Sequence, residues 1–135
     1  MAKESGIVAV VSVDNSSGSA QTISNSITDF SISTPRNMIT ITGLDKLAEE
    51  RAQGLADFSV TFNGVFDDGS NLAHAIFSTV SSSSVIRTTT ITISGQILPN
   101  EVFYTDYSIS RSASAELTWS SPGVLTGGVV PTWTT

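Results

Sequence analysis

The chain has 135 residues, a length that suits one domain with a modest core, and 39% of its residues are hydrophobic. Its net charge is −6 with an isoelectric point near 4.4. Its six basic residues are scattered along the sequence, which argues against tight binding of nucleic acid, because such binding needs clustered cations. The chain contains no cysteine, so disulfides and thiolate metal sites are excluded.

The polar residues favour β-structure. Only 13% of the residues are charged, whereas serine and threonine together number 40. Threonine is β-branched and suits strands, while serine and threonine are both poor residues for a helix interior. We therefore predict a mainly β fold. No apolar run approaches the ~20 residues of a membrane span, so we expect no membrane insertion.

The first 34 residues predict a strand followed by a hairpin arm. Residues 7–13 are apolar on both faces, as expected for a strand buried on both sides. After a turn, residues 20–34 alternate weakly, with Phe30 and Ile32 on one face, and we interpret this stretch as a hairpin arm. A short strand follows over 38–42.

Residues 42–68 predict a short helix that leads into a strand. Thr42 with Asp45 offers a capping box, and Gly54 can end the helix. The apolar side of the helix, at helical spacing, would consist of Leu44, Leu47 and Ala48, followed by Arg51. The strand is indicated by the strict alternation of Phe58, Val60 and Phe62 with polar residues.

The second half predicts one more helix and three strands. Residues 72–80 form an apolar stripe at helical spacing, with the one histidine, His74, off that stripe. We expect strands over 85–94, 101–111 and 114–120. In these strands Phe103 and Trp119 are expected to face inward and Tyr104 outward. In the earlier strand 38–42, Ile39 and Ile41 are expected to face inward. We divide the chain into a β-domain over 1–121 and a C-terminal arm over 122–135 that leaves the domain.

Residues for catalysis are scarce. A single histidine offers no material for a triad or a metal cluster, and we interpret His74 as a surface residue. Residues 67–71, DDGSN, lack the ligand spacing and closing glutamate of a calcium loop, and a turn explains them. No phosphate-cradling glycine motif is present. We expect no catalytic site, no metal and no cofactor, and hence no enzyme.

One stretch resembles a known family. Residues 41–69, ITGLDKLAEERAQGLADFSVTFNGVFDDG, are similar to the segment of small tail tube subunits in which a TGxDK-x-x-E-R-x-x-G-L run leads into a strand. The similarity extends more loosely through 72–80. On these residues the chain resembles the major tail tube proteins of long-tailed, siphovirus-like bacteriophages.

The resemblance implies both a fold and a role. The fold would be a β-sandwich or barrel with one or two short flanking α-helices. Six subunits would form a ring, and stacked rings would form the tail tube that conducts DNA into the host. A hairpin loop and a terminal arm would contact neighbouring rings. The implied partners are the chain itself and the tape measure, tail terminator and baseplate or tip proteins, in a virion tail assembled in the host cytoplasm.

Two groups of residues are candidates for this role. A hydroxyl-rich, mildly acidic tube wall would let DNA slide without specific binding, because it offers few cations to hold each phosphate. The lumen candidates are acidic residues expected on polar strand faces: Asp57, Asp106 and Glu116. The subunit-interface candidates are Asp45, Lys46, Glu49, Glu50, Arg51, Leu125, Val129, Val130 and Trp133.

An alternative is a carbohydrate-binding or adhesive β-sandwich on a virion surface. Such a module would need an exposed aromatic platform. Trp119 is buried by pattern, Trp133 lies in the C-terminal arm, and Tyr104 stands alone on a polar face.

Overall fold

A computed structural model describes residues 9–83 and 85–135. In this part of the chain the structure is mainly β, with one short α-helix, which confirms the predicted fold class. The elements are, in order, β1 (Ala9–Asp14), β2 (Ala20–Thr22), the 3-10 helix η2 (Ser24–Ser26), β3 (Asp29–Ser33), β4 (Arg36–Thr40), β5 (Arg51–Ala56), β6 (Ser59–Val65), α1 (Ala73–Phe77), β7 (Arg87–Ile93), β8 (Gln96–Tyr104), β9 (Ser108–Arg111) and β10 (Leu117–Leu125).

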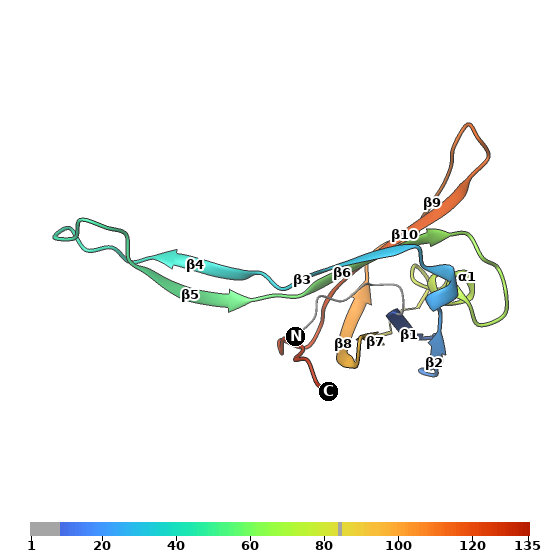
Figure 1. The fold of residues 1–135 in the computed structure, drawn as a ribbon, viewed down its shortest axis with the longest axis horizontal. Helices are drawn as coiled ribbons and strands as arrows, with labels where there is room; N and C mark the ends of the chain where they lie inside the picture. Colours follow the sequence, from blue (N-terminus) through green and yellow to red (C-terminus); the bar gives the residue numbers. More distant parts are fainter. Residues whose placement is uncertain (1–8, 84) are drawn as a thin grey trace.

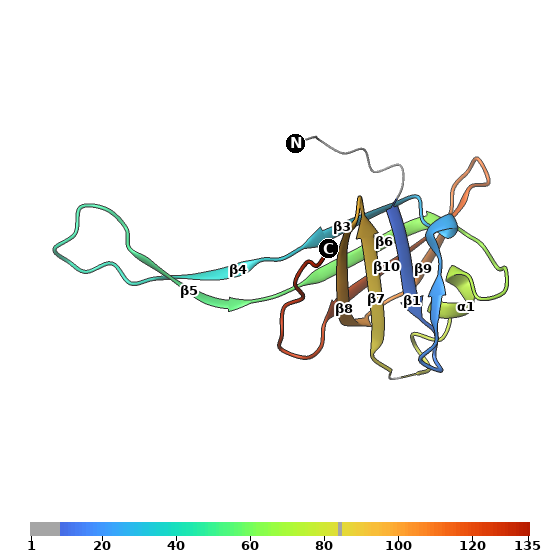
Figure 2. The same ribbon diagram turned by 60° about the horizontal axis from the view of Figure 1, so that its bottom comes forward.

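Eight of the strands form one antiparallel sheet in the order β2-β1-β7-β8-β10-β6-β3, and β9 pairs with the first half of β10. β8 and β10 share only three residue pairs, between Val102–Tyr104 and Gly123–Leu125. At this narrow junction the sheet folds over. One layer contains β2, β1, β7 and β8, and the other contains β3, β6, β10 and β9, which run across the first (Figure 2).

The hydrophobic core lies between the two layers and α1. Every second residue of the central strands points into it, so Phe58, Val60 and Phe62 are buried as predicted. Trp119 is also buried as predicted, and its ring lies 5.1 Å from that of Phe77 on α1. The helix predicted over 72–80 is confirmed as α1, which buries three of its five residues.

Two buried polar side chains, Arg87 and Tyr104, hold neighbouring elements together. The Arg87 guanidinium donates to the backbone oxygens of Asp14 and Ile76 and to Oγ1 of Thr79 (2.8 Å), which fixes the end of α1 against β1 and β7. Loss of solvation lowers the pKa of Arg87. The Tyr104 hydroxyl lies 2.5 Å from Oγ1 of Thr89, and burial raises the pKa of Tyr104 above its usual value.

The helix predicted within 42–54 is wrong. These residues form the end loop of a hairpin and strand β5, and Leu44 and Leu47 are fully exposed. The helical spacing of apolar residues stabilises a helix only where a core can receive that stripe, and no part of the described core reaches this segment. Thr42 caps no helix, because its hydroxyl bonds to the backbone of Glu50 across the loop.

The hairpin arm exists, but the predicted residues are wrong. In the stretch 20–34, β2 pairs with β1 and β3 pairs with β6, so the two strands do not pair with each other. The arm is formed instead by β4 and β5, which continue the β3–β6 pair beyond a bend at Pro35 and Asp57. The Asp57 N–H donates to the Pro35 oxygen at this bend, 2.9 Å away.

Several predicted faces are also corrected. Tyr104 is buried and Phe103 exposed, the reverse of the prediction, because β8 continues unbroken through Pro99 and sets the alternation. Ile39 and Ile41 are exposed because they lie on the arm. The first strand buries one face only, with Val10 at 44% exposure. Residues 7 and 8 of that predicted strand lie outside the described residues.

The C-terminal arm predicted from residue 122 begins later and does not leave the domain. β10 runs through Pro122 to Leu125 and pairs with β6 along this whole stretch. The last residues then return to the sheet, where Thr134 forms a bridge with Ile97 at the start of β8.

Candidate assembly surfaces

The β4–β5 hairpin projects far from the rest of the molecule (Figure 1). Every residue of β4 is exposed, and none of β5 is fully buried. A two-stranded hairpin without further packing is at best marginally stable in water. The arm nevertheless carries six exposed large apolar side chains, namely Met38, Ile39, Ile41, Leu44, Leu47 and Leu55. Clustered exposed apolar residues of this kind mark a protein interaction surface.

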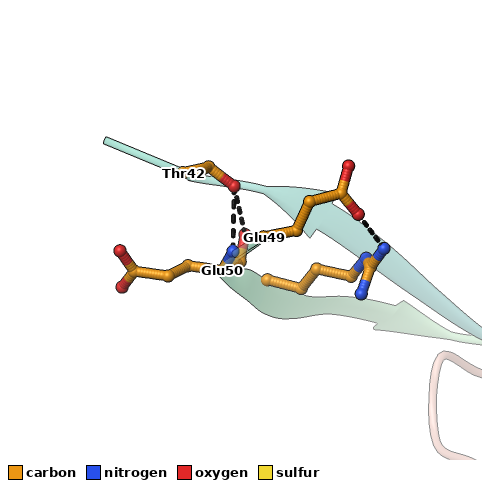
Figure 3. Close-up of polar contacts among 4 residues, drawn as sticks. Thr42, Glu49 and Glu50 are labelled. Atoms are coloured by element: carbon orange, nitrogen blue, oxygen red, sulfur yellow. Dashed lines mark hydrogen bonds and ion pairs between the residues drawn. The ribbon is translucent and has the colours of Figure 1, made fainter. Parts of the chain in front are cut away.

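Polar contacts close the loop at the end of the arm (Figure 3). The Glu50 N–H donates to Oγ1 of Thr42 at 2.8 Å, and Arg51 pairs with Glu49. Lys46 lies 4.0 Å from Glu50. The five charged residues predicted as interface candidates, Asp45, Lys46, Glu49, Glu50 and Arg51, therefore lie in the same end loop as Leu44 and Leu47 or at the start of β5. The tip thus exposes both apolar and charged side chains, as the surfaces of interfaces do.

The outer face of the β3-β6-β10-β9 layer is rich in hydroxyl groups. The strand registers bring eight of them to this side of the sheet: Ser31, Ser33, Ser59, Thr61, Ser108, Ser110, Thr118 and Ser120. We call this surface the hydroxyl face. Ser110 and Thr118 lie opposite each other with their hydroxyl oxygens 3.4 Å apart.

The hydroxyl face is almost free of charge. Among the residues of its four strands, the one ionisable side chain on this side is Asp29, which accepts a hydrogen bond from Nδ2 of Asn63 at 2.6 Å. Arg111 stands opposite Leu117 and so belongs to the other side of the layer. The face can form many weak hydrogen bonds with a passing polar surface but holds no cation to bind a phosphate.

The same layer ends in two open edges. In the described part of the chain, β3 pairs only with β6, and β9 pairs only with β10. Each edge strand therefore has unpaired main-chain N–H and C=O groups along its free side, a ready template for another strand. The edges lie on opposite sides of one layer, so a contact between them would join two copies head to tail.

Comparisons with known proteins agree with this architecture. No protein-family model matches the chain, and no curated protein matches it. Several solved structures are similar, and two of them are described here. One is a chain of the virion of a native gene transfer agent (GTA) particle, with a TM-score of 0.79, and the other a chain of the tail of an empty GTA particle refined with helical, C6 symmetry, with a TM-score of 0.80. Each is 16% identical, and each alignment covers 98% of this chain and 100% of the other.

The chain has the fold of a GTA tail protein. The two alignments cover nearly the whole chain, so the similarity is not limited to the central sheet. At 16% identity this similarity establishes the fold and leaves the role of each surface to be argued from the residues themselves.

The three lumen candidates do not lie on strands, contrary to the premise of that prediction. Asp57 and Asp106 lie between strands, where each carboxylate accepts the N–H of the following residue. Glu116 lies at the tip of the β9–β10 hairpin. Asp57 and Glu116 flank opposite ends of the β6–β10 ladder and do not form one acidic patch. That they face a lumen stays a prediction.

The apolar interface candidates lie at the C-terminal end. Leu125 ends β10 and packs partly against the core. Val129 and Trp133 remain exposed, at 77% and 47%, and Val130 is half-buried. These side chains follow β10 closely, so they form a second exposed apolar group separate from the arm.

His74 is not the plain surface residue that the sequence predicts. It is half-buried, its ring lies 4.8 Å from that of Phe66, and its Nδ1 lies 3.0 Å from the Tyr107 hydroxyl. The described residues include no group of three or more potential metal ligands. No helix among them is long and apolar enough to cross a membrane.

The hydroxyl face was missed by reasoning from the sequence. Its signal is present, since serine and threonine recur at every second position in residues 31–33, 59–61, 108–110 and 118–120. Alternation places each residue on one side of its strand, but it does not say which strands are neighbours. Only the tertiary pairing shows that the four short runs form one surface.

Proposed function

We propose that this chain is a structural subunit, without catalytic activity, of a phage-like tail tube. In this proposal, six copies form a ring, rings stack into a tube, and DNA passes through the lumen into the host. The observation that carries the proposal is the apolar arm, which projects from the domain and has no packing partner within the described subunit. The C6 symmetry of the GTA tail with the same fold supports the number six.

Ring closure would use the two open edges. β3 of one copy would add to β9 of the next, which extends the layer around the ring and leaves no strand edge free. A head-to-tail contact of this type closes when the rotation between copies divides a full turn.

Stacking would use the arm. Its length lets the tip, with Leu44 and Leu47, reach past the body of its own subunit to another copy. Burial there would remove from water the apolar side chains that the free subunit exposes. The charged side chains of the tip would then select the correct binding position on the neighbouring copy by charge complementarity.

The hydroxyl face would line the lumen. Edge pairing of six copies would place these faces side by side as one continuous wall. Such a wall would bind DNA only weakly, because it has no cationic side chain to neutralise a phosphate and release its counterions. It would also repel the phosphates little, because it has few carboxylates. The acidic candidates Asp57, Asp106 and Glu116 would flank this wall rather than form it.

The further partners follow from the tube itself. A tube of fixed length needs a tape measure protein inside, a terminator at one end and a baseplate or tip protein at the other. We propose these as partners, in a virion tail that assembles in the host cytoplasm. Of the three aromatic residues considered for a carbohydrate platform, Trp119 and Tyr104 are buried, which leaves Trp133 as the exposed one.

Negative-stain and cryo-electron microscopy of the purified chain test assembly. We expect rings or tubes with six-fold symmetry and a central hole. A chain that stays monomeric at high concentration, in the presence and absence of a tape measure segment, would contradict the proposal.

Cysteine labelling tests the lumen assignment, since the natural chain has no cysteine to interfere. Thr61→Cys reports on the hydroxyl face, Thr90→Cys on the outer side of the other layer, and Glu116→Cys on the acidic candidate. In tubes, a lumen position should react with a small maleimide but not with a maleimide carrying a large polymer. Reaction of Thr61→Cys with both reagents would place the hydroxyl face outside.

A further inference from the structure

Two pairs of neighbouring residues have the sequence that most readily forms a succinimide, an asparagine or aspartate followed by glycine. They are Asn63–Gly64 and Asp68–Gly69. In such a pair the main-chain nitrogen of the glycine attacks the side-chain carbonyl carbon of the residue before it, and glycine has no Cβ to obstruct the approach. In an unfolded chain the asparagine pair reacts faster, because its amide lacks the negative charge that protects a carboxylate. In the folded chain the two pairs have very different surroundings.

The asparagine pair is held inside the sheet. Both residues lie within β6 and pair with β10, and Asn63 also lies opposite Asp29 of β3. Nδ2 of Asn63 donates to Oδ1 of Asp29 at 2.6 Å. Gly64 is buried so close to the main chain of Ser26 that an added Cβ would lie 1.9 Å from its oxygen. Ring closure turns the side chain back onto its own main chain, so it would have to break these contacts.

The aspartate pair lies in the open. Asp68 and Gly69 follow the end of β6 and precede α1, outside any strand or helix, and Asp68 is exposed. Among the described residues, no hydrogen bond or ion pair holds the Asp68 side chain. Closure of a ring at Asp68 would therefore break no contact of this side chain within the described structure.

The carboxylate of Asp67 is placed beside the attacking nitrogen. The Gly69 N–H donates to Oδ1 of Asp67 at 3.1 Å, and Oδ2 of the same carboxylate accepts a hydrogen bond from the Ser26 hydroxyl at 3.3 Å. Because an N–H bond lies in the plane of its peptide group, this hydrogen bond leaves both faces of the nitrogen open for attack. The carboxylate stands where a base must stand to take the proton that the nitrogen loses.

We propose that Asp68 is a site of spontaneous isomerisation to isoaspartate in the folded chain, with Asp67 as the proton acceptor. The Gly69 nitrogen bonds to Cγ of Asp68 in its acid form, and its proton passes through the Asp67 carboxylate to the departing hydroxyl, which leaves as water. The product is a succinimide. Solvent water then breaks one of the two bonds of the ring nitrogen. Cleavage at Cγ restores aspartate, and cleavage at the main-chain carbonyl carbon leaves isoaspartate, with no net change in mass.

Isoaspartate at this position would disturb the start of α1. Its main chain runs through Cβ and Cγ and is therefore one atom longer than that of aspartate. The Asp67 oxygen, just before the insertion, accepts the His74 N–H at 3.3 Å, and α1 buries three apolar side chains in the core. The longer connection shifts this contact, so the isomerised subunit should unfold at a lower urea concentration than the fresh one.

Peptide mass spectrometry of the full-length chain, aged in heavy-oxygen water, tests the site. One sample is kept folded and one is kept in urea. Isoaspartate at position 68 is recognised by its altered chromatographic retention and by one incorporated heavy oxygen, and deamidation of Asn63 by its increased mass. We expect Asp68 to isomerise faster than Asn63 deamidates in the folded sample, and the reverse order in urea. Asn63 should react roughly 10³-fold more slowly when folded, because a core strand opens rarely.

Two variants test the chemistry. Asp68→Glu keeps the charge but cannot form the five-membered ring, so it is the matched control and should yield no isomer. Asp67→Asn keeps an oxygen that can accept the Gly69 N–H but takes up no proton, so Asp68 should isomerise more slowly in it. The Asn63 rate in the same sample reports opening of the sheet and identifies a variant that has merely unfolded.

Two results would overturn the proposal. In the folded chain, deamidation of Asn63 at least as fast as isomerisation of Asp68 would mean that the fold does not select the aspartate pair. An unchanged isomerisation rate in Asp67→Asn would remove Asp67 from the reaction.

Discussion

Substitutions at the tip of the arm should affect assembly without affecting the folding of the subunit. Leu44 and Leu47 are fully exposed in the subunit, so changing both to serine should alter its free energy of unfolding by no more than about 0.5 kcal/mol each. If stacking buries both side chains, each loses about 1.5–3 kcal/mol of transfer free energy on substitution. The two together weaken each arm contact by roughly 3–6 kcal/mol, which is about 10²- to 10⁴-fold in its association constant.

The assay compares two measurements on the same protein. Urea unfolding of the dilute subunit gives its stability, and sedimentation of tubes over a concentration series gives the critical concentration for assembly. We expect Leu44→Ser/Leu47→Ser to match the wild type in the first and to require at least about 100-fold more protein in the second. The matched control, Leu44→Met/Leu47→Met, keeps the apolar volume and should assemble nearly as the wild type does.

The result that refutes this reasoning is assembly of the double serine variant at the wild-type concentration. The arm tip would then stay in water in the tube. A large loss of subunit stability would refute a different step, because it would mean that the two leucines pack within their own chain.

Three further predictions follow from the core. Gly64→Ala should lower the free energy of unfolding in urea by about 3 kcal/mol or more, because the added Cβ would lie 1.9 Å from a backbone oxygen. The control is Gly54→Ala on the arm, where the added Cβ has no contact under 3.4 Å, and it should change stability by less than about 1 kcal/mol. Stability should fall above pH 10, because the buried Tyr104 hydroxyl keeps its proton in the folded state while the same hydroxyl ionises in the unfolded state. The free energy of unfolding should then fall by up to about 1.4 kcal/mol per pH unit, and Tyr104→Phe should remove most of this dependence. Deletion of residues 122–135 should abolish cooperative unfolding because it removes part of β10, while deletion of 126–135 should leave a folded subunit, and circular dichroism on heating distinguishes the two.

The sequence by itself determined the fold class and much of the core. Strict alternation identified Phe58, Val60 and Phe62 as buried, and helical spacing located α1, because both patterns report on short stretches whose geometry is set locally. The similarity of residues 41–69 to tail tube subunits pointed to the fold, and the structure and the GTA tail chains bear it out.

The same pattern misled where no core was present. Leu44, Leu47 and Ala48 fit a helix, yet a helical stripe is stable only against a partner, and here the chain continues two strands outward as an arm. Likewise, Phe103 and Tyr104 face opposite sides from those predicted. Which residues of β8 face the core depends on the register of the strand, since a shift of one residue moves every side chain to the other face.

Only the tertiary structure decided which strands are neighbours, and the candidate surfaces depend on that. The hydroxyl face joins residues from four separate stretches, and an isolated bridge joins Thr134 to Ile97. Hydrogen bonds between distant strands form these pairings, and their choice reflects how the whole sheet covers the core rather than the preference of any one segment. The local sequence thus specifies which way a side chain points, and the packed sheet specifies what it meets there.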